Sequence, residues 1–116
     1  MIKIVTTNYM GQAENKPQLE ILKYLLSKGH LAWRNNNGAL WDSKLNAYRS
    51  NPYTPKGLPD ILLIDREEYG QLVGLEVKTT KGRPSASQLL VQKRFRLNNA
   101  RYEFVTSIQD VKALGL

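Results

Sequence analysis

Residues 57–78 read GLPDILLIDREEYGQLVGLEVK, and this stretch predicts an antiparallel β-hairpin. Two strand-like runs, 60–65 and 71–78, flank the polar segment 66–70. A short polar connection that ends in glycine is typical of a hairpin. We therefore expect the two runs to pair side by side.

The register of this hairpin decides where its charged residues lie. A turn centred on residue 68, midway between Asp60 and Glu76, places these two carboxylates directly opposite each other. Directly paired side chains on one face of a sheet lie about 4.5–5.5 Å apart at their Cβ atoms, so the two acids could hold one cation. The same register pairs Leu62 with Gly74 and Ile64 with Leu72.

Alternation along the second strand separates the charged face from the core. Lys78 falls on the face of Glu76, and the opposite face carries Val73, Leu75 and Val77. Two neighbouring carboxylates repel unless positive charge lies close to them, and a divalent ion together with Lys78 would supply it. The alternative is an ordinary surface salt-bridge cluster in which Lys78 neutralises the acids.

Residues 14–28 show helical periodicity. One narrow stripe of this helix is expected to face inward, formed by Glu14, Gln18, Ile21 and Leu25. We expect Pro17 within the first turn, since further in it would break the backbone ladder, and Glu14 at or just before the helix start. Gly29 is expected to end the helix. The less favoured alternative is an exposed first turn, which would also explain Glu14 and Gln18.

The stretch 36–57 is rich in Asn, Ser, Tyr, Pro and Gly and follows a short predicted strand, 31–35. A loop of this length inside a compact domain usually has a function or is disordered. Basic and aromatic residues interleave in it, namely Lys44, Tyr48, Arg49, Tyr53 and Lys56. This pattern is compatible with contact to nucleic acid, and a flexible insertion is the alternative.

The remaining elements complete an alternation of strands and helices. We expect a short strand or arm at 2–5, a second helix at 85–99, a strand at 102–107 and a closing helix at 108–114. Ser107 or Asp110 is expected to cap the closing helix.

Composition restricts the classes of protein to consider. The chain has 116 residues, 41% of them hydrophobic and 23% charged, which predicts one globular domain, 1–116. The longest wholly apolar run is Ile61–Ile64, far short of the roughly 20 residues of a membrane span, and the N-terminus shows no signal-peptide pattern. We expect a cytoplasmic protein with no membrane partner.

The absence of cysteine excludes disulfides, thiolate zinc sites and thiol nucleophiles, and His30 is the only histidine. A metal would therefore take oxygen ligands, which suit Mg²⁺ or Mn²⁺. The net charge is +7, and the stretch 79–102 carries no acidic residue. Its basic residues predict a phosphate-binding surface and are Lys81, Arg83, Lys93, Arg94, Arg96 and Arg101.

Several motifs together resemble one nuclease family. Pro59-Asp60 followed by Glu76-Val77-Lys78 matches the PD-(D/E)xK nuclease signature. The chain also resembles the narrower VRR-NUC branch of this superfamily. The matching motifs occur in family order over residues 14–92 and are Glu14-xxx-Gln18, Ala32-Trp33-Arg34-Asn35-Asn36, Gly57-Leu58-Pro59-Asp60, Gly74-Leu75-Glu76-Val77-Lys78 and Ser85 with Gln88. The chain resembles the short, stand-alone VRR-NUC proteins of bacteria and phages, from which it departs at Pro17 and at residues 37–56.

The resemblance implies an α/β fold, a restriction-endonuclease-like mixed central β-sheet flanked by α-helices. It implies metal ligation by Glu14, Asp60, Glu76 and the Val77 carbonyl, and catalytic roles for Glu14, Asp60, Glu76, Lys78 and Gln88. With the basic run it suggests DNA contacts from Gln18, Lys81, Arg83, Ser85, Lys93, Arg94 and Arg96.

The function expected from this resemblance is a Mg²⁺- or Mn²⁺-dependent, structure-selective DNA endonuclease. A homodimer that resolves four-way (Holliday) junctions fits best, because two cuts need two sites related by a twofold axis. A flap- or nick-directed nuclease is the alternative within the same chemistry. A non-catalytic DNA-binding module and a protein with structural surface ion pairs are alternatives of other classes.

Overall fold

A computed structural model of the chain describes residues 12–35, 39–50 and 53–116, without the side chains of 12–15, 39–40 and 48–50. The predicted strand at 2–5 lies outside these residues. Nine elements follow one another in the order α1 Gln12–Ser27, β1 Leu31–Arg34, β2 Ala39–Asp42, β3 Ala47–Ser50, β4 Ile61–Asp65, β5 Gln71–Val77, α2 Ala86–Leu97, β6 Arg101–Val105 and α3 Ile108–Ala113.

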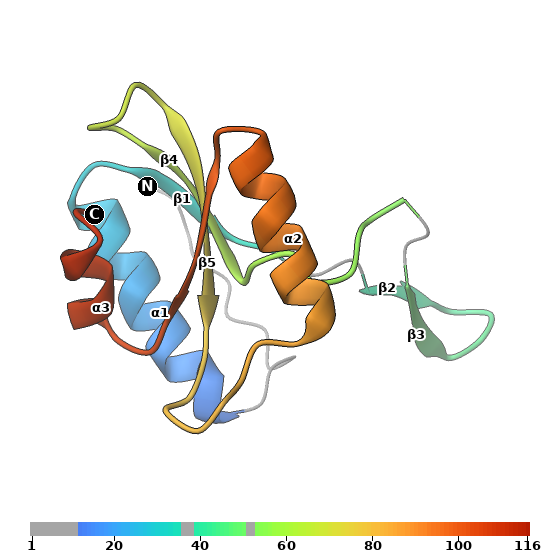
Figure 1. The fold of residues 1–116 in the computed structure, drawn as a ribbon. Helices are drawn as coiled ribbons and strands as arrows, with labels where there is room; N and C mark the ends of the chain where they lie inside the picture. Colours follow the sequence, from blue (N-terminus) through green and yellow to red (C-terminus); the bar gives the residue numbers. More distant parts are fainter. Residues whose placement is uncertain (1–11, 36–38, 51–52) are drawn as a thin grey trace.

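The centre of the fold is a mixed four-stranded sheet with the strand order β1-β4-β5-β6 (Figure 1). Strands β1, β4 and β5 are antiparallel neighbours, whereas β6 pairs parallel to β5. A parallel pair needs a long crossover, and α2 supplies it. This is the mixed, helix-flanked sheet that the sequence predicted.

The β4–β5 hairpin has the predicted register. Leu62 pairs with Gly74 and Ile64 with Leu72, so the turn is centred on residue 68. The alternation holds as well, because Val73, Leu75 and Val77 are fully buried in the core.

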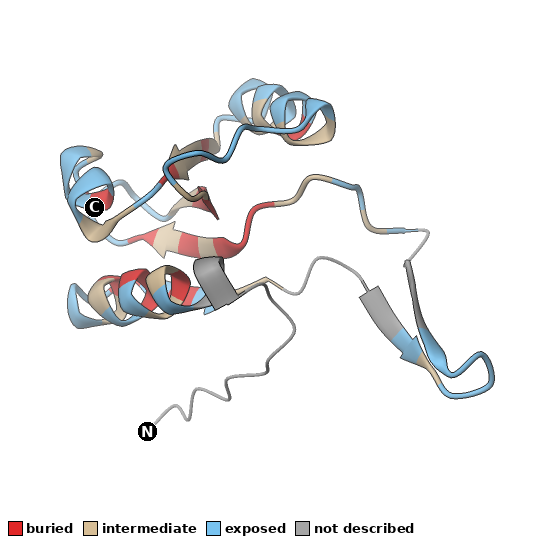
Figure 2. Ribbon diagram, turned by 90° about the horizontal axis from the view of Figure 1, so that it is seen from below, coloured by how far each residue is buried: buried red, intermediate tan, exposed pale blue. Residues whose placement is uncertain are grey.

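The core lies between the sheet and two helices. Ile21 and Leu25 of α1 and Val111 of α3 join the buried face of β4 and β5 in one apolar cluster. Helix α2 packs on the other face, where Phe95 approaches Gly74. Figure 2 shows the burial concentrated in the central strands and on the inner sides of α1 and α3.

Helix α1 differs from the prediction at its start. It begins at Gln12, so Pro17 lies in its second turn and Glu14 inside the helix. Pro17 has no N–H to donate to the carbonyl of Ala13, its acceptor one turn earlier in the helix. The predicted end is confirmed, since Gly29 has a φ of 88° and the chain turns there into β1.

The stretch 36–57 contains regular structure that the sequence analysis missed. Strands β2 and β3 form an antiparallel hairpin, with Trp41 paired to Tyr48. Both views show this hairpin standing away from the four-stranded sheet (Figures 1 and 2). In the part of the chain that the structure describes, no helix is both long and apolar enough to span a bilayer.

Candidate active site

The open end of the β4–β5 hairpin brings two acids together. Ile61 pairs with Leu75, and continuing this register by one residue places Asp60 opposite Glu76. Both residues are buried, Asp60 at 5% and Glu76 at 4% exposure. Carboxylates are rarely buried to this extent unless they are paired or bind a metal.

Pro59 and Gly74 explain why the strand begins where it does. A Cβ on Gly74 would lie 2.4 Å from Cγ of Pro59 and 3.1 Å from Cε2 of Phe95, so the proline ring rests on the bare backbone of Gly74. The chain therefore approaches β4 over the sheet face that α2 covers. Asp60 lies at the corner where the chain turns into β4.

Backbone and side-chain hydrogen bonds hold this corner. The backbone N–H of Val77 donates to Oδ2 of Asp60 over 2.9 Å, which fixes the carboxylate at the end of β5. Asn35, which directly follows β1, donates its backbone N–H to the carbonyl of Asp60 at 2.7 Å and its Nδ2–H to the carbonyl of Pro59 at 3.2 Å.

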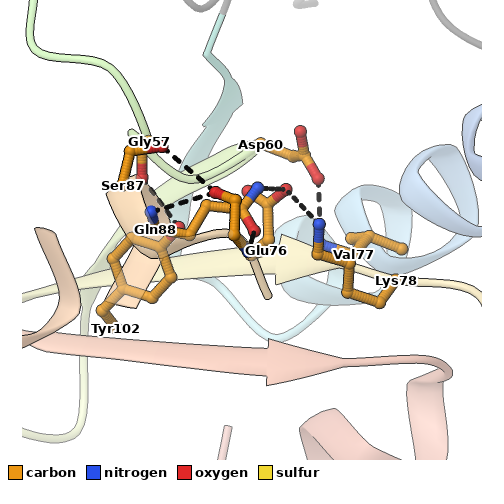
Figure 3. Close-up of polar contacts among 9 residues, drawn as sticks. Gly57, Asp60, Glu76, Val77, Lys78, Ser87, Gln88 and Tyr102 are labelled. Atoms are coloured by element: carbon orange, nitrogen blue, oxygen red, sulfur yellow. Dashed lines mark hydrogen bonds and ion pairs between the residues drawn. The ribbon is translucent and has the colours of Figure 1, made fainter. Parts of the chain in front are cut away.

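Glu76 is held by one neighbour from its own strand end and one from α2. Gln88 donates Nε2–H to Oε1 of Glu76 over 2.8 Å, and Nζ of Lys78 lies 3.6 Å from the same oxygen (Figure 3). The Lys78 and Glu76 side chains are 16% and 6% exposed, so the ion pair is not the surface cluster that the sequence left open. Lys78 is also fixed to β6, through its backbone N–H and the Val105 carbonyl.

Gln88 can reach Glu76 because of its place in the α2 N-cap. Its Oε1 accepts from the backbone N–H of Ser85, and Oγ of Ser85 accepts from the backbone N–H of Gln88. This reciprocal capping box fixes the rotamer of Gln88 and leaves the amide N–H₂ group directed at the acid. The predicted proximity of Gln88 to the site is confirmed.

Tyr102 is a site residue that the sequence analysis missed. Its phenol is buried beneath the two acids and donates to the carbonyl of Gly57 at 2.8 Å (Figure 3). Gly57 has a φ of 89°, and a Cβ there would lie 2.5 Å from the carbonyl oxygen of Ser87. The entry to Pro59-Asp60 is thus clamped between β6 and the start of α2.

The electrostatics of Tyr102 reflect its position. Burial, and then the negative charges of Glu76 and Asp60, raise the pKa of the Tyr102 phenol above its ordinary value of 10.0. The hydroxyl therefore remains a proton donor throughout the neutral range. The Gly57-Leu58-Pro59-Asp60 motif marks the acceptor in the sequence, but no pattern marks the donor.

Helix α1 contributes the predicted inward stripe, with Gln18, Ile21 and Leu25 all fully buried. The side chain of Gln18 has no exposed surface, and the DNA contact expected of it stays a prediction. Neither amide atom of Gln18 has a hydrogen-bond partner among the described side chains and backbone. Glu14 lies one helical turn before it, with its side chain outside the described set.

The predicted basic surface is largely exposed. Solvent-exposed side chains are those of Lys81, Arg83, Lys93, Arg94 and Arg96. Arg101 is different, because it donates to the carbonyl of Leu114 at the end of α3. Ser85 is exposed and acts locally as the N-cap of α2.

The donor set fits a hard divalent cation. Asp60 and Glu76 offer carboxylate oxygens on facing positions, and Val77 lies between Glu76 and Lys78 at the same strand end. Such oxygen ligands suit Mg²⁺ and Mn²⁺. No three His, Cys, Asp or Glu side chains gather as a metal site within the described set, which does not include the side chain of Glu14.

Comparison with known proteins supports this assignment of the fold. A solved structure described as a VRR_NUC domain matches the chain with a TM-score of 0.62 and 26% sequence identity, over 90% of this chain and 95% of the other. No protein-family model and no curated protein matches the sequence. Over most of its length the chain is therefore similar to a VRR_NUC domain, and the end of its central hairpin carries the residues Pro59-Asp60 and Glu76-Val77-Lys78 that resemble the PD-(D/E)xK nuclease signature.

Proposed function

We propose that this chain is a Mg²⁺- or Mn²⁺-dependent endonuclease that hydrolyses phosphodiester bonds in DNA. The observation that carries the proposal is the pair of buried acids, Asp60 and Glu76, opposite each other at the hairpin end with Lys78 beside them. It is supported by the likeness to a solved VRR_NUC domain.

A DNA-binding module without catalysis does not account for these acids. Burying a carboxylate costs several kcal/mol even after relaxation of the protein. Acids close to a bound phosphate would also repel it. A cation between Asp60 and Glu76 removes both penalties.

Four groups of the chain are proposed as ligands of this ion: the carboxylates of Glu14, Asp60 and Glu76, and the carbonyl of Val77. When bound, such an ion supplies Lewis-acid chemistry, activating a water molecule and offsetting charge on the phosphate. The hydrogen bond from Val77 N–H to Asp60 and that from Gln88 to Glu76 set the orientation of two ligands before the ion arrives.

Lys78 is the proposed catalytic cation. Its ammonium group lies within 3.6 Å of Glu76 and is mostly withdrawn from solvent, which strengthens its field at the site. There it can orient the attacking water or stabilise negative charge that develops on the phosphate in the transition state.

The exposed basic residues are proposed to hold the DNA backbone. They lie on α2, whose start contacts Glu76 through Gln88, and on the loop that joins β5 to α2. Contacts of this kind position a nucleic acid without reading its sequence, so we expect recognition by shape.

The substrate that we propose is a four-way junction cut by a homodimer. Each chain carries one pair of acids, and a junction must be cut on two strands, which a twofold-symmetric pair of sites achieves. A nuclease that cuts flaps or nicked ends as a monomer is the second candidate, since its chemistry would be the same.

Cleavage of defined substrates tests these proposals. Labelled four-way junction, flap and linear duplex are incubated with the protein and Mg²⁺, Mn²⁺ or EDTA, beside Asp60→Asn and Lys78→Ala. We expect junction cutting that EDTA and both substitutions abolish. Preferential cutting of flaps would favour the second candidate, and equal cutting of linear duplex would remove the resolvase assignment. Binding without cutting under every metal would leave only a binding module.

A further inference from the structure

The β2–β3 hairpin, residues 39–50, forms a projecting arm (Figure 1). Its strands pair with each other, from Ala39 with Ser50 to Asp42 with Ala47. Neither strand packs extensively on any other described helix or strand. The arm projects from the sheet in both views (Figures 1 and 2).

The turn of the arm is nevertheless well built. Oδ1 of Asp42 accepts the backbone N–H groups of Lys44 at 2.9 Å and of Leu45 at 3.3 Å. Asn46 takes the left-handed conformation, with a φ of 50°, that closes the turn. Asp42 is the only acid of the arm, and its charge serves this turn.

The outward side chains of the arm are aromatic and basic. Trp41 is 55% exposed and Leu45 66% exposed, and Lys44 at the turn is exposed as well. Tyr53, beyond the arm, is 93% exposed. An isolated two-stranded hairpin is marginally stable in water, so an exposed tryptophan on it gains most from a surface that covers it.

The arm leads directly into the active site. After the arm the chain reaches Gly57, which is clamped by Tyr102 and the start of α2, and Asp60 follows three residues later. The arm, which ends at Ser50, therefore lies ten residues before Asp60 in the chain.

We propose that the arm is a second nucleic-acid contact, in which Trp41 stacks on an unpaired base of the substrate while Lys44 contacts a phosphate. The inference rests on the proposed function for the identity of the ligand, DNA. Base stacking on aromatic residues beside cations is the general mode of single-strand recognition. A second copy of the chain fits less well, because the described part of the arm offers Leu45 as its only large exposed aliphatic side chain.

Tryptophan fluorescence tests the stacking directly. The chain has two tryptophans, so Trp33→Phe makes Trp41 the sole reporter. Asp60→Asn is added to prevent cleavage. We expect a short single-stranded oligonucleotide to quench Trp41, and a blunt duplex of equal length to quench it less. An unchanged spectrum at saturating single strand would overturn the proposal.

Affinity measurements supply the second readout. Trp41→Ala is expected to weaken single-strand binding by about tenfold to hundredfold, and Trp41→Phe to retain most of it. Tyr69→Ala is the matched control, since Tyr69 is a fully exposed aromatic on the β4–β5 turn and its loss should change nothing. Equal affinities for Trp41→Ala and Tyr69→Ala would refute the contact.

The outcomes separate this inference from the proposed nuclease activity. If the oligonucleotide quenches Trp41 in the fluorescence variant and the parent protein cuts no substrate, the arm is sustained and the nuclease is refuted. If the parent protein cuts DNA and Trp41 of the variant is not quenched, the nuclease is sustained and the arm is refuted. If Trp41→Ala changes the mass of the particle in solution and leaves the affinity per chain intact, the arm is instead an interface between copies.

Discussion

At the residue scale, single hydrogen bonds set the geometry of the site. Gln88 belongs both to the cap of α2 and to the surroundings of Glu76, so one side chain couples the helix to the acid. In the same way Tyr102 of β6 holds the segment that precedes Asp60, by donating to the carbonyl of Gly57. Neither residue needs to touch the substrate to affect the reaction.

Gln88→Glu separates the two tasks of this side chain. Glutamate is as good as glutamine at this position of a capping box, so the helix start is retained. It cannot donate to Glu76 and adds a negative charge beside it. We expect nuclease activity to fall at least tenfold while the midpoint of thermal unfolding moves by only a few degrees.

Gln92→Glu is the control, because Gln92 donates a comparable hydrogen bond, 2.9 Å long, to the carbonyl of Tyr102. Equal losses of activity in the two variants would show that the charge beside Glu76 is irrelevant.

Tyr102→Phe removes the hydroxyl that holds Gly57. A lost hydrogen bond of this kind costs about 1 kcal/mol of unfolding free energy. We expect kcat to fall several-fold with little change in KM, because Asp60 is displaced while the DNA-binding surface is intact. Tyr24→Phe is the control, since Tyr24 donates to the Leu116 carbonyl at 2.8 Å, so stability should fall alike and kcat should not.

The raised pKa of Tyr102 adds a dependence on pH. The unfolded phenol ionises near its ordinary pKa of 10.0, whereas the folded phenol keeps its proton to higher pH. Its contribution to stability is thus complete below pH 10 and is lost as the pH rises further. Urea unfolding between pH 9 and 11 should show this loss in the parent protein and less of it in Tyr102→Phe.

The residue scale also shows where sequence reasoning stops. Asp60, Glu76 and Lys78 could be placed because a short turn fixes an antiparallel register. Tyr102 could not, because β6 pairs parallel to β5 after a helical crossover whose length does not fix the register. Gly57 was visible as part of a motif, but its contact with Ser87 depends on how α2 packs.

At the element scale, periodicity predicted the helices and the central hairpin and missed the arm. The strands of the arm have four residues each, and its turn is closed by Asn46 rather than by an Asn-Gly or Asp-Gly pair. Asp42 four residues before Asn46 was the signal that could have revealed it. Pro17 led to a different error. Because proline is expected in the first turn of a helix, the helix was predicted to begin at about Glu14, whereas α1 begins at Gln12.

Helix α2 carries the DNA-binding prediction at this scale. Arg94 and Arg96 are both exposed in its last turn. Replacing both by alanine should weaken binding to every DNA substrate and reduce the slope of log affinity against log salt by about two units. The measurement is fluorescence anisotropy over a salt series.

The control for this prediction is Lys23→Ala with Lys28→Ala, which removes the same charge from exposed positions on α1 or just beyond it. An equal change of slope in both double variants would mean that net charge, rather than the α2 surface, governs binding.

At the scale of the whole molecule, the proposed function places one active site on each chain, and the net charge of +7 suits a polyanionic substrate. If the junction is cut by a homodimer, a mixed dimer of parent and Asp60→Asn chains should nick it on one strand only. Tagged chains, co-purified and assayed on labelled junction, test this. Complete resolution of the junction by the mixed dimer would contradict the prediction that each active site cuts one strand.

The proposed nuclease activity depends most on a cation that Asp60 and Glu76 bind together. Calorimetric titration of Mn²⁺ into the protein without DNA measures this directly. We expect saturable binding that is lost in Asp60→Asn and in Glu76→Gln and is retained in Lys78→Ala. Binding of undiminished affinity in both acid variants, or no binding to the parent protein, would contradict the shared cation site.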